Sequence, residues 1–167
     1  MFFQHVDKGA AILDLGCGSG RDSKFFIDNG FTVEAIDGSY ELCKSASRYI
    51  GQPVRHIMFQ DLDYVDKFDG IWACASLLHI PIESLPEILD KISLALKHNG
   101  ILYASFKYGD FSGERNGRIF TDLDEAKLED ILKLTNGLHI LQTTLSYDVR
   151  PDRNNEKWLN VIIKKIL

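Results

Sequence analysis

The amino-acid sequence predicts an α/β fold with a doubly wound, mostly parallel sheet, because short apolar runs alternate with helical patterns almost from the first residue. The first apolar run, 10–15, is nearly continuous, as in strands that are buried on both faces. Five strand–helix units are followed by two strand-like runs that a turn joins, so we expect one antiparallel strand at the end of the sheet.

The first half of the chain alternates strands with helices that punctuating glycines separate. Its predicted elements are strand 10–15, a glycine-rich turn, a helix through 25–27, strand 31–36, a helix over about 40–50, and strands 54–59 and 68–75. Gly30 follows the first helix and fits the left-handed position at which many helices end.

In the second half, Pro81 and Pro86 mark the start of a helix, with Ser84 as its predicted cap. The elements that follow are strand 101–106, a polar, glycine-containing loop 107–120, a helix opened by Thr121, and strand-like runs 138–149 and 158–166. Residues 150–156, which join the last two runs, are turn-forming types. We expect one domain over residues 1–167, since no linker or repeat interrupts the pattern.

Composition excludes several classes of protein. The 167 residues are 45% hydrophobic, and 19 Lys and Arg against 24 Asp and Glu give a net charge of −5, which argues against a nucleic-acid partner. No apolar run could span a bilayer, and no signal-peptide pattern is present, so no membrane partner is expected. Cys17, Cys43 and Cys74 form no CxxC pair, so we expect no metal site and a cytoplasmic location.

The most informative segment is the loop Gly16-Cys17-Gly18-Ser19-Gly20 between the first strand and the first helix. Glycines at this spacing allow a sharp turn and close approach of the backbone to a ligand, and the helix that follows offers free N–H groups. Asp37 ends the second strand, where an acid can accept hydrogen bonds from both ribose hydroxyls of a nucleoside. The alternative is a tight turn in which Asp37 only caps the next helix.

The spacing G-x-G-x-G differs from the dinucleotide fingerprint G-x-G-x-x-G. In addition, Asp14 directs a carboxylate toward the loop, which would repel a pyrophosphate but suits a ligand with an ammonium group. A nicotinamide-dependent oxidoreductase is therefore disfavoured.

With these motifs, the chain resembles the class I S-adenosylmethionine-dependent methyltransferases along nearly its whole length. The segments that carry the resemblance are 14–20, Asp37, 60–62, 68–78 and 97–101. Ile101 stands where the family usually shows a second glycine, a mild departure. The resemblance implies a Rossmann-like, seven-stranded sheet of order 3-2-1-4-5-7-6 with a reversed last strand. It also implies N-terminal cover helices, which in this chain are short or missing.

By similarity, Gly16 and Gly18 pass under the methionine part of S-adenosylmethionine, Asp37 holds the ribose, and Asp61 with the Leu62 amide holds the adenine. The residues that the resemblance assigns to cofactor binding are Asp14, Gly16, Cys17, Gly18, Gly20, Asp37, Gly38, Asp61, Leu62, Ala75 and Ser76. Ala75 and Ser76 would line the side of the methyl donor. A solvated surface acid is the alternative for Asp61.

His79, just past the fourth strand, is the candidate catalytic residue, because an imidazole there could deprotonate or orient a methyl acceptor. The alternative is a histidine that packs beside Pro81. A dedicated base is optional for methyl transfer, because the sulfonium donor already carries the activation.

Basic and aromatic residues are predicted to gather at the same edge of the sheet. They are Lys107, Tyr108, Arg115, Arg118, Arg150, Arg153 and Trp158. Convergent guanidinium groups would favour an anionic acceptor, such as a carboxylate or phosphate, whereas the alternative is an ordinary solvated loop.

The leading hypothesis is a methyltransferase that acts on a small-molecule acceptor and functions as a monomer or homodimer. Residues 75–78 lack the Pro-Pro-aromatic element of enzymes that methylate nucleic-acid bases. The amino-acid sequences of segments 16–23 and 76–81 resemble those of the branch that includes tellurite-resistance-type methyltransferases. A non-catalytic S-adenosylmethionine-binding sensor, or the subunit of a complex, is the alternative.

Overall fold

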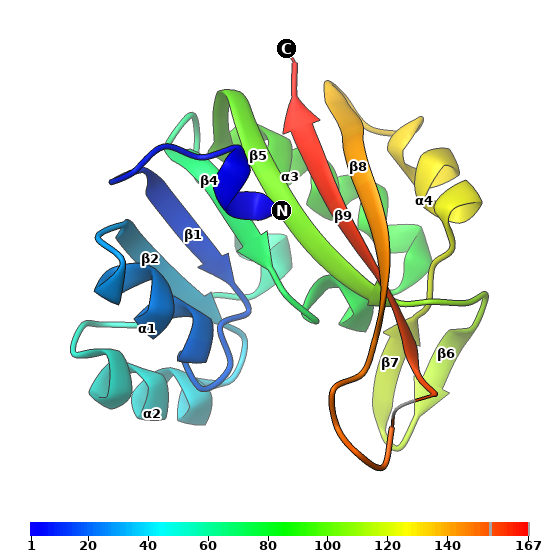
Figure 1. The fold of residues 1–167 in the computed structure, drawn as a ribbon, viewed down its shortest axis with the longest axis horizontal. Helices are drawn as coiled ribbons and strands as arrows, with labels where there is room; N and C mark the ends of the chain where they lie inside the picture. The colour runs from blue at the N-terminus through cyan, green and yellow to red at the C-terminus, as the bar shows by residue number, and fades with distance from the viewer. Residues whose placement is uncertain (154, 167) are drawn as a thin grey trace.

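The computed structural model describes residues 1–153 and 155–166. Its centre is a seven-stranded sheet of order β3-β2-β1-β4-β5-β9-β8 (Figure 1). The strands are β1 (Ala11–Leu15), β2 (Thr32–Asp37), β3 (Arg55–His56), β4 (Phe68–Ala73), β5 (Leu96–Lys107), β8 (Leu138–Tyr147) and β9 (Lys157–Lys165). The first five strands run parallel, and β9 is antiparallel to both of its neighbours, β5 and β8. The predicted sheet, including its order and reversed last strand, is confirmed.

Helices cover the two faces of this sheet. They are α1 (Arg21–Asp28), α2 (Tyr40–Ile50), α3 (Leu85–Ala95) and α4 (Glu125–Leu132), with short 3₁₀ turns η1 (Phe2–Gln4), η2 (Phe59–Asp61), η3 (Leu77–His79) and η4 (Ile82–Ser84). Figure 1 shows α3 and α4 on the opposite side of the sheet from η1 and α1. No helix in the described part of the chain is long and apolar enough to cross a membrane.

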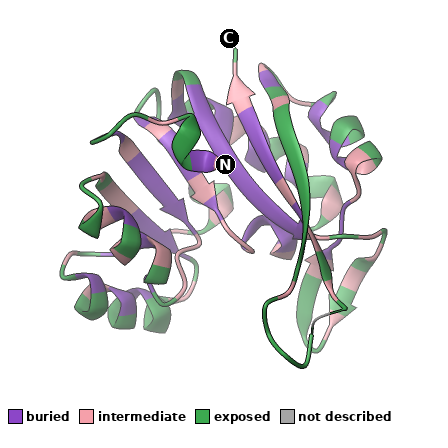
Figure 2. Ribbon diagram, in the orientation of Figure 1, coloured by how far each residue is buried: buried purple, intermediate pink, exposed green. Residues whose placement is uncertain are grey.

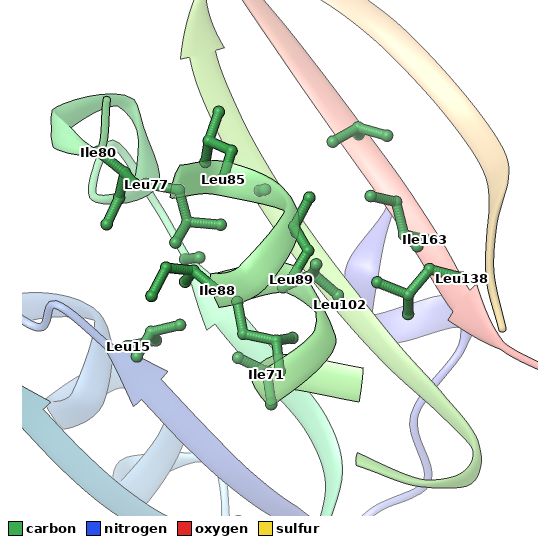
Figure 3. Close-up of a cluster of buried hydrophobic side chains, with 14 of the residues drawn as sticks. Leu15, Ile71, Leu77, Ile80, Leu85, Ile88, Leu89, Leu102, Leu138 and Ile163 are labelled. Carbon is green, nitrogen blue, oxygen red and sulfur yellow. The ribbon is translucent and has the colours of Figure 1, made fainter. Parts of the chain in front are cut away.

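The larger core lies between α3, α4 and the sheet. Leu85, Ile88 and Leu89 of α3 are buried against Ile71 of β4 and Leu102 of β5 (Figure 3). The apolar positions of α3 recur at spacings of three and four, so one face of the helix can be buried along its whole length. Figure 2 shows the same layering, with buried residues along the central strands and exposed residues along β8.

The opposite face of the sheet carries an aromatic cluster at the N-terminus. Phe2 is buried, and its ring packs edge-on against Trp72 of β4 and Phe26 of α1, with centroid distances of 5.3 Å and 6.0 Å. Trp72 also stacks on Tyr103 of β5 at 3.9 Å. The first residues of the chain therefore anchor α1 to the middle of the sheet.

The region predicted as a loop over 107–120 contains a hairpin instead. It consists of β6 (Ser112–Arg115) and β7 (Arg118–Thr121), joined by Asn116 and Gly117. Both turn residues have positive φ, 52° and 76°, as a type I′ turn requires. Asn-Gly between two short strands is the local signal that could have predicted this hairpin.

The sequence predicted that Thr121 opens helix α4, but the residue that caps this helix is Asp124. The Asp124 carboxylate accepts a hydrogen bond from the Lys127 N–H at 2.8 Å, whereas the Thr121 hydroxyl donates to the Ile80 carbonyl at 2.7 Å. Thr121 is paired in β7 and is not free to cap. Ser84 does precede α3, but its side chain makes no capping hydrogen bond.

The largest differences between predicted and observed strand boundaries are in the third and fifth strands. The third strand is limited to Arg55–His56 because the chain turns into η2 directly afterwards. The fifth strand begins five residues earlier than expected, at Leu96, because Phe68 pairs with Leu96 before the register shifts and Gly70 pairs with Ile101.

Gly20 and Gly30, which flank α1, offer a matched pair of substitutions. Both have left-handed φ values, 83° and 82°, but a Cβ at Gly20 would lie 2.8 Å from Ile50 Cγ2, whereas nothing lies within 4 Å at Gly30. Gly30→Ala should lower the free energy of unfolding by about 1 kcal/mol, the cost of a left-handed alanine. Gly20→Ala should cost about 2–4 kcal/mol, because overpacking against α2 adds to it. Urea unfolding measures both, and equal losses would contradict the contact.

Candidate cofactor and acceptor site

The glycine loop after β1 is fastened to the end of β2. The N–H groups of Gly16 and Cys17 both donate to the Ile36 carbonyl at 3.0 Å. Gly16, Gly18 and Gly20 all have positive φ. A Cβ at Gly16 would lie 2.5 Å from Ser76 Cβ, so the loop can approach β4 only with glycine at this position.

Asp37 connects this loop to the turn after β2. One of its carboxylate oxygens accepts a hydrogen bond from the Gly18 N–H at 2.8 Å, and the other accepts one from the Ser39 N–H at 2.8 Å. Helix α2 is capped by Ser39, whose hydroxyl oxygen accepts from the Leu42 N–H. Asp37 is therefore not the helix cap. Each of its oxygens retains acceptor capacity, which is what binding of ribose hydroxyls requires.

Asp14 lies beneath the loop at the end of β1. Asp14 is 3% exposed, and its carboxyl group accepts a hydrogen bond from the Ser23 hydroxyl at 2.5 Å. Burial raises the pKa of Asp14 to about 7. A carboxyl group in this state is poised to ionise when a positively charged group binds beside it. Burial likewise raises the pKa of the neighbouring Cys17 thiol, which therefore stays protonated at neutral pH.

The segment after β3 approaches the loop from the other side. A Cβ at Gly38 would lie 3.1 Å from Met58 Sδ, and a Cβ at Gly16 would lie 3.3 Å from the Phe59 ring. Met58 therefore lies against the turn after β2, and Phe59 lies against the glycine loop. Sequence reasoning missed them, although they immediately precede the motif that it quoted.

The two residues predicted to hold the adenine differ in their surroundings. Asp61 is exposed, whereas Leu62 is buried and its N–H donates to the Phe59 carbonyl at 3.3 Å. An adenine ring would therefore compete with this long turn hydrogen bond for the Leu62 amide.

The end of β4 provides the side predicted to face the methyl donor. Ala75 adopts φ of 51°, unusual for a residue with a side chain, and its N–H donates to the Ser105 hydroxyl at 2.8 Å. The Ser76 hydroxyl donates to the Leu15 carbonyl at 2.6 Å. Ser76 thus connects the end of β4 to β1 through its side chain. A strained backbone such as that of Ala75 is typical of functional sites.

His79 ends η3, the short turn that follows Ser76. Its Nδ1 lies 2.9 Å from the Ile119 carbonyl, and its ring packs edge-on against Phe120 at 4.8 Å. A carbonyl can only accept, so Nδ1 carries the proton and Nε2 of the neutral ring is left as an acceptor. This tautomer is the one that a general base would need.

The predicted cluster of basic and aromatic residues is divided between two cavities. Lys107, Tyr108, Arg115, Arg118 and Arg153 line a cavity of about 930 Å³ between the β6–β7 hairpin and the β8–β9 turn. Arg150 and Trp158 line a separate cavity of about 370 Å³, together with Cys74, Ala75 and Tyr103. The second cavity therefore adjoins the end of β4 directly.

The cations of the group also differ in how they are paired. Lys107 pairs with Glu156 at 2.7 Å, Arg115 with Asp122 at 2.7 Å, and Arg150 with Asp148 at 2.5 Å.

In the described ranges, no group of three or more His, Cys, Asp or Glu residues is arranged to hold a metal ion.

The site as a whole fits a nucleoside that carries an amino group. Three features meet between β1, β2 and β4: a glycine loop with no room for a Cβ at Gly16, an acid with free acceptor capacity at the end of β2, and a buried carboxyl group beneath the loop. Together with the reversed β9, these features define the class of S-adenosylmethionine-dependent α/β proteins.

Comparison with known proteins identifies the family. Residues 12–100, just over half of the chain, match the family described as a methyltransferase domain, and the chain belongs to this family. The prediction of a class I S-adenosylmethionine-dependent methyltransferase is confirmed at the level of the family. YqeM of Bacillus subtilis (strain 168), named as a methyltransferase, is 31% identical over 126 residues, which are 68% of this chain and 49% of the relative. The chain thus spans about half the length of this curated relative.

Solved structures share the fold. A 1,6-didemethyltoxoflavin-N1-methyltransferase from Burkholderia thailandensis, solved with bound 1,6-didemethyltoxoflavin and S-adenosylhomocysteine, has a TM-score of 0.82 and 23% identity, covering 98% of this chain and 74% of that one. An S-adenosylmethionine-dependent methyltransferase from Methanosarcina mazei has a TM-score of 0.84 and 19% identity, covering 98% and 96% of the two chains.

The raised pKa of Asp14 gives a prediction for cofactor binding. Below about pH 7 the Asp14 carboxyl group holds a proton, which it must release to face a bound ammonium group. The affinity for S-adenosylhomocysteine should therefore fall as the pH falls, by about tenfold between pH 7.5 and pH 6. Calorimetry across this range measures it. Asp14→Asn should bind more weakly with a flat profile, and an equal slope in this variant would contradict the assignment.

Proposed function

We propose that the chain is one catalytic domain that transfers the methyl group of S-adenosylmethionine to a small-molecule acceptor at the carboxyl edge of the sheet. The observation that carries this proposal is the glycine cradle held by Asp37, which lies beside the strained end of β4. A cavity of about 370 Å³ adjoins that end, which is enough for a small acceptor.

In this proposal the chain positions the two reactants and excludes water. The cofactor supplies an activated methyl group, so the acceptor needs only a lone pair in line with the bond that breaks. Asp37 would hold the ribose, Asp14 the amino group, and Asp61 with Leu62 the adenine. The remaining cofactor contacts would come from the glycine loop, Gly38, Ala75 and Ser76.

His79 is the candidate base for acceptors that carry a proton. Its Nε2 is the free acceptor once Nδ1–H donates to the Ile119 carbonyl. The imidazole would take the acceptor's proton during the transfer. A histidine that only supports Phe120 is the alternative, and the two roles predict different kinetics.

The surroundings of the site favour an acceptor with a negative charge. Lys107, Arg115, Arg118 and Arg153 all line the larger cavity at the same edge.

Cys17, Cys43 and Cys74 are free thiols, which suits the reducing cytoplasm that we propose as the location. Assignment to the tellurite-resistance-like branch stays a prediction.

A non-catalytic role is the second candidate, because the cavity beside Ala75 is open to solvent and a sensor needs only to bind the cofactor. Turnover separates the two functions. Incubation with methyl-labelled S-adenosylmethionine and a panel of small acceptors, neutral and anionic, should yield a labelled product and S-adenosylhomocysteine. Tight cofactor binding without turnover of any acceptor would instead support the sensor.

For a catalytic His79, His79→Gln should lower kcat by about 10²–10⁴-fold and remove one ionisation step from the pH profile, with little change in cofactor affinity. His98→Gln, at the opposite end of the sheet, is the matched control. If His79 only packs against Phe120, the variant should lose stability and keep its pH profile. That result would exclude the catalytic role.

A further inference from the structure

The larger cavity, between the β6–β7 hairpin and the β8–β9 turn, is positively charged in a chain of negative net charge. Five cationic and three acidic side chains line it: Lys107, Arg115, Arg118, Arg153 and Lys157, against Asp122, Asp152 and Glu156. The chain as a whole carries a net charge of −5. The positive charge is therefore concentrated here, against the overall balance of the molecule.

Internal ion pairs neutralise only part of this charge. Lys107 donates to Glu156 at 2.7 Å, and Arg115 donates two hydrogen bonds to Asp122, at 3.1 Å and 2.7 Å. Within residues 1–153 and 155–166, neither Arg118 nor Arg153 forms an ion pair. Three lining cations, Arg118, Arg153 and Lys157, thus have no ion pair among the described residues, against one such acid, Asp152, so positive charge is left for an external anion.

The hairpin places like charges directly opposite each other. Arg115 and Arg118 close the turn as a cross-strand pair, an arrangement that destabilises a sheet. Arg115 cannot swing away, because Asp122 holds it from one side and its guanidinium stacks over the Phe111 ring at 3.8 Å. The tight turn at Asn116 keeps Arg118 beside it. Asp122 balances the charge of Arg115, so the charge that remains available on this side of the hairpin is that of Arg118.

The cavity is in contact with the edge where the methyl group is transferred. Phe120 lines the cavity and packs against the His79 ring, and η3 connects His79 to Ser76. On the other side, Lys107 pairs in the sheet with Trp158, which lines the smaller cavity beside Ala75. The paired ends of β5 and β9 thus border both cavities.

We propose that Arg118 and Arg153 bind an oxyanion of the methyl acceptor, a carboxylate or a phosphate, while its reactive atom lies at the end of β4. This inference rests on the proposed function. Guanidinium groups suit such anions because their N–H groups match two oxygens at once. Arg115, already neutralised by Asp122, forms a fixed wall of the site.

Titration of the full chain with inorganic phosphate and with succinate, at constant ionic strength, tests the oxyanion site. Amide and arginine Nε resonances should report saturable binding confined to residues 107–122 and 150–157. Arg118→Gln combined with Arg153→Gln should weaken this binding at least tenfold. Arg48→Gln, on the exposed face of α2, should leave the anion affinity unchanged. Arg118→Lys combined with Arg153→Lys should give an affinity between those of the wild type and the double Gln variant, because lysine keeps the charge but not the two-pronged geometry. The tighter of the two probes identifies the anion as a phosphate or a carboxylate.

Calorimetry with S-adenosylhomocysteine on the same variants separates this inference from the proposed function. The double Gln variant should bind S-adenosylhomocysteine as the wild type does. Cofactor binding without saturable anion binding, or equal anion binding in the double variant, would overturn the oxyanion site and leave the methyltransferase proposal intact. Anion binding by a folded chain that does not bind S-adenosylhomocysteine would overturn the link to a methyl acceptor.

Discussion

The hydrogen bond from the Gly18 N–H to the Asp37 carboxylate is the contact on which the site depends. It joins the glycine loop after β1 to the end of β2, and the bonds from Gly16 and Cys17 to Ile36 hold the same loop from below. The three glycines of the loop have no side chains that could hold it in place, and these backbone hydrogen bonds fix its position against β2. The acid that fits a ribose therefore also builds the cradle in which the nucleoside would lie.

A second connection fixes the side of the site where chemistry is expected. The Ser76 hydroxyl donates to the Leu15 carbonyl, which draws the end of β4 against the end of β1. The chain beyond Ser76 leads through η3 to His79 and the β6–β7 hairpin. Cofactor cradle, candidate base and cationic cavity are thus consecutive parts of one edge of the sheet, where ligands bind in folds of this kind.

Most of the fold could be predicted from the sequence, because buried parallel strands and amphipathic helices have distinct periodicities. Helix α2 spans residues 40–50 as predicted. The predicted start of α4 was wrong because Thr121 and Asp124 are both good capping residues. Only the pairing of Thr121 in β7 decides between them. The hairpin could have been predicted from Asn116-Gly117, a local signal that does not depend on tertiary contacts.

The site was less predictable, because side-chain directions depend on distant partners. The position of Asp37 follows from its place at the end of β2, but its hydrogen bond to Gly18 does not. The Ser76 hydroxyl points to β1 rather than toward a ligand, which no local pattern indicates. Similarly, the sequence groups the arginines, but only the structure shows that Asp122 neutralises Arg115.

The most direct test of the account is parallel calorimetry of the purified chain with S-adenosylhomocysteine and NAD. The central claim is that a cradle fastened by Asp37, with a buried Asp14 beneath it, accepts a nucleoside bearing an ammonium group and rejects a pyrophosphate. We expect one-site, micromolar binding of S-adenosylhomocysteine and no measurable binding of NAD. Binding of NAD in preference to S-adenosylhomocysteine, or of neither by a folded sample, would contradict it.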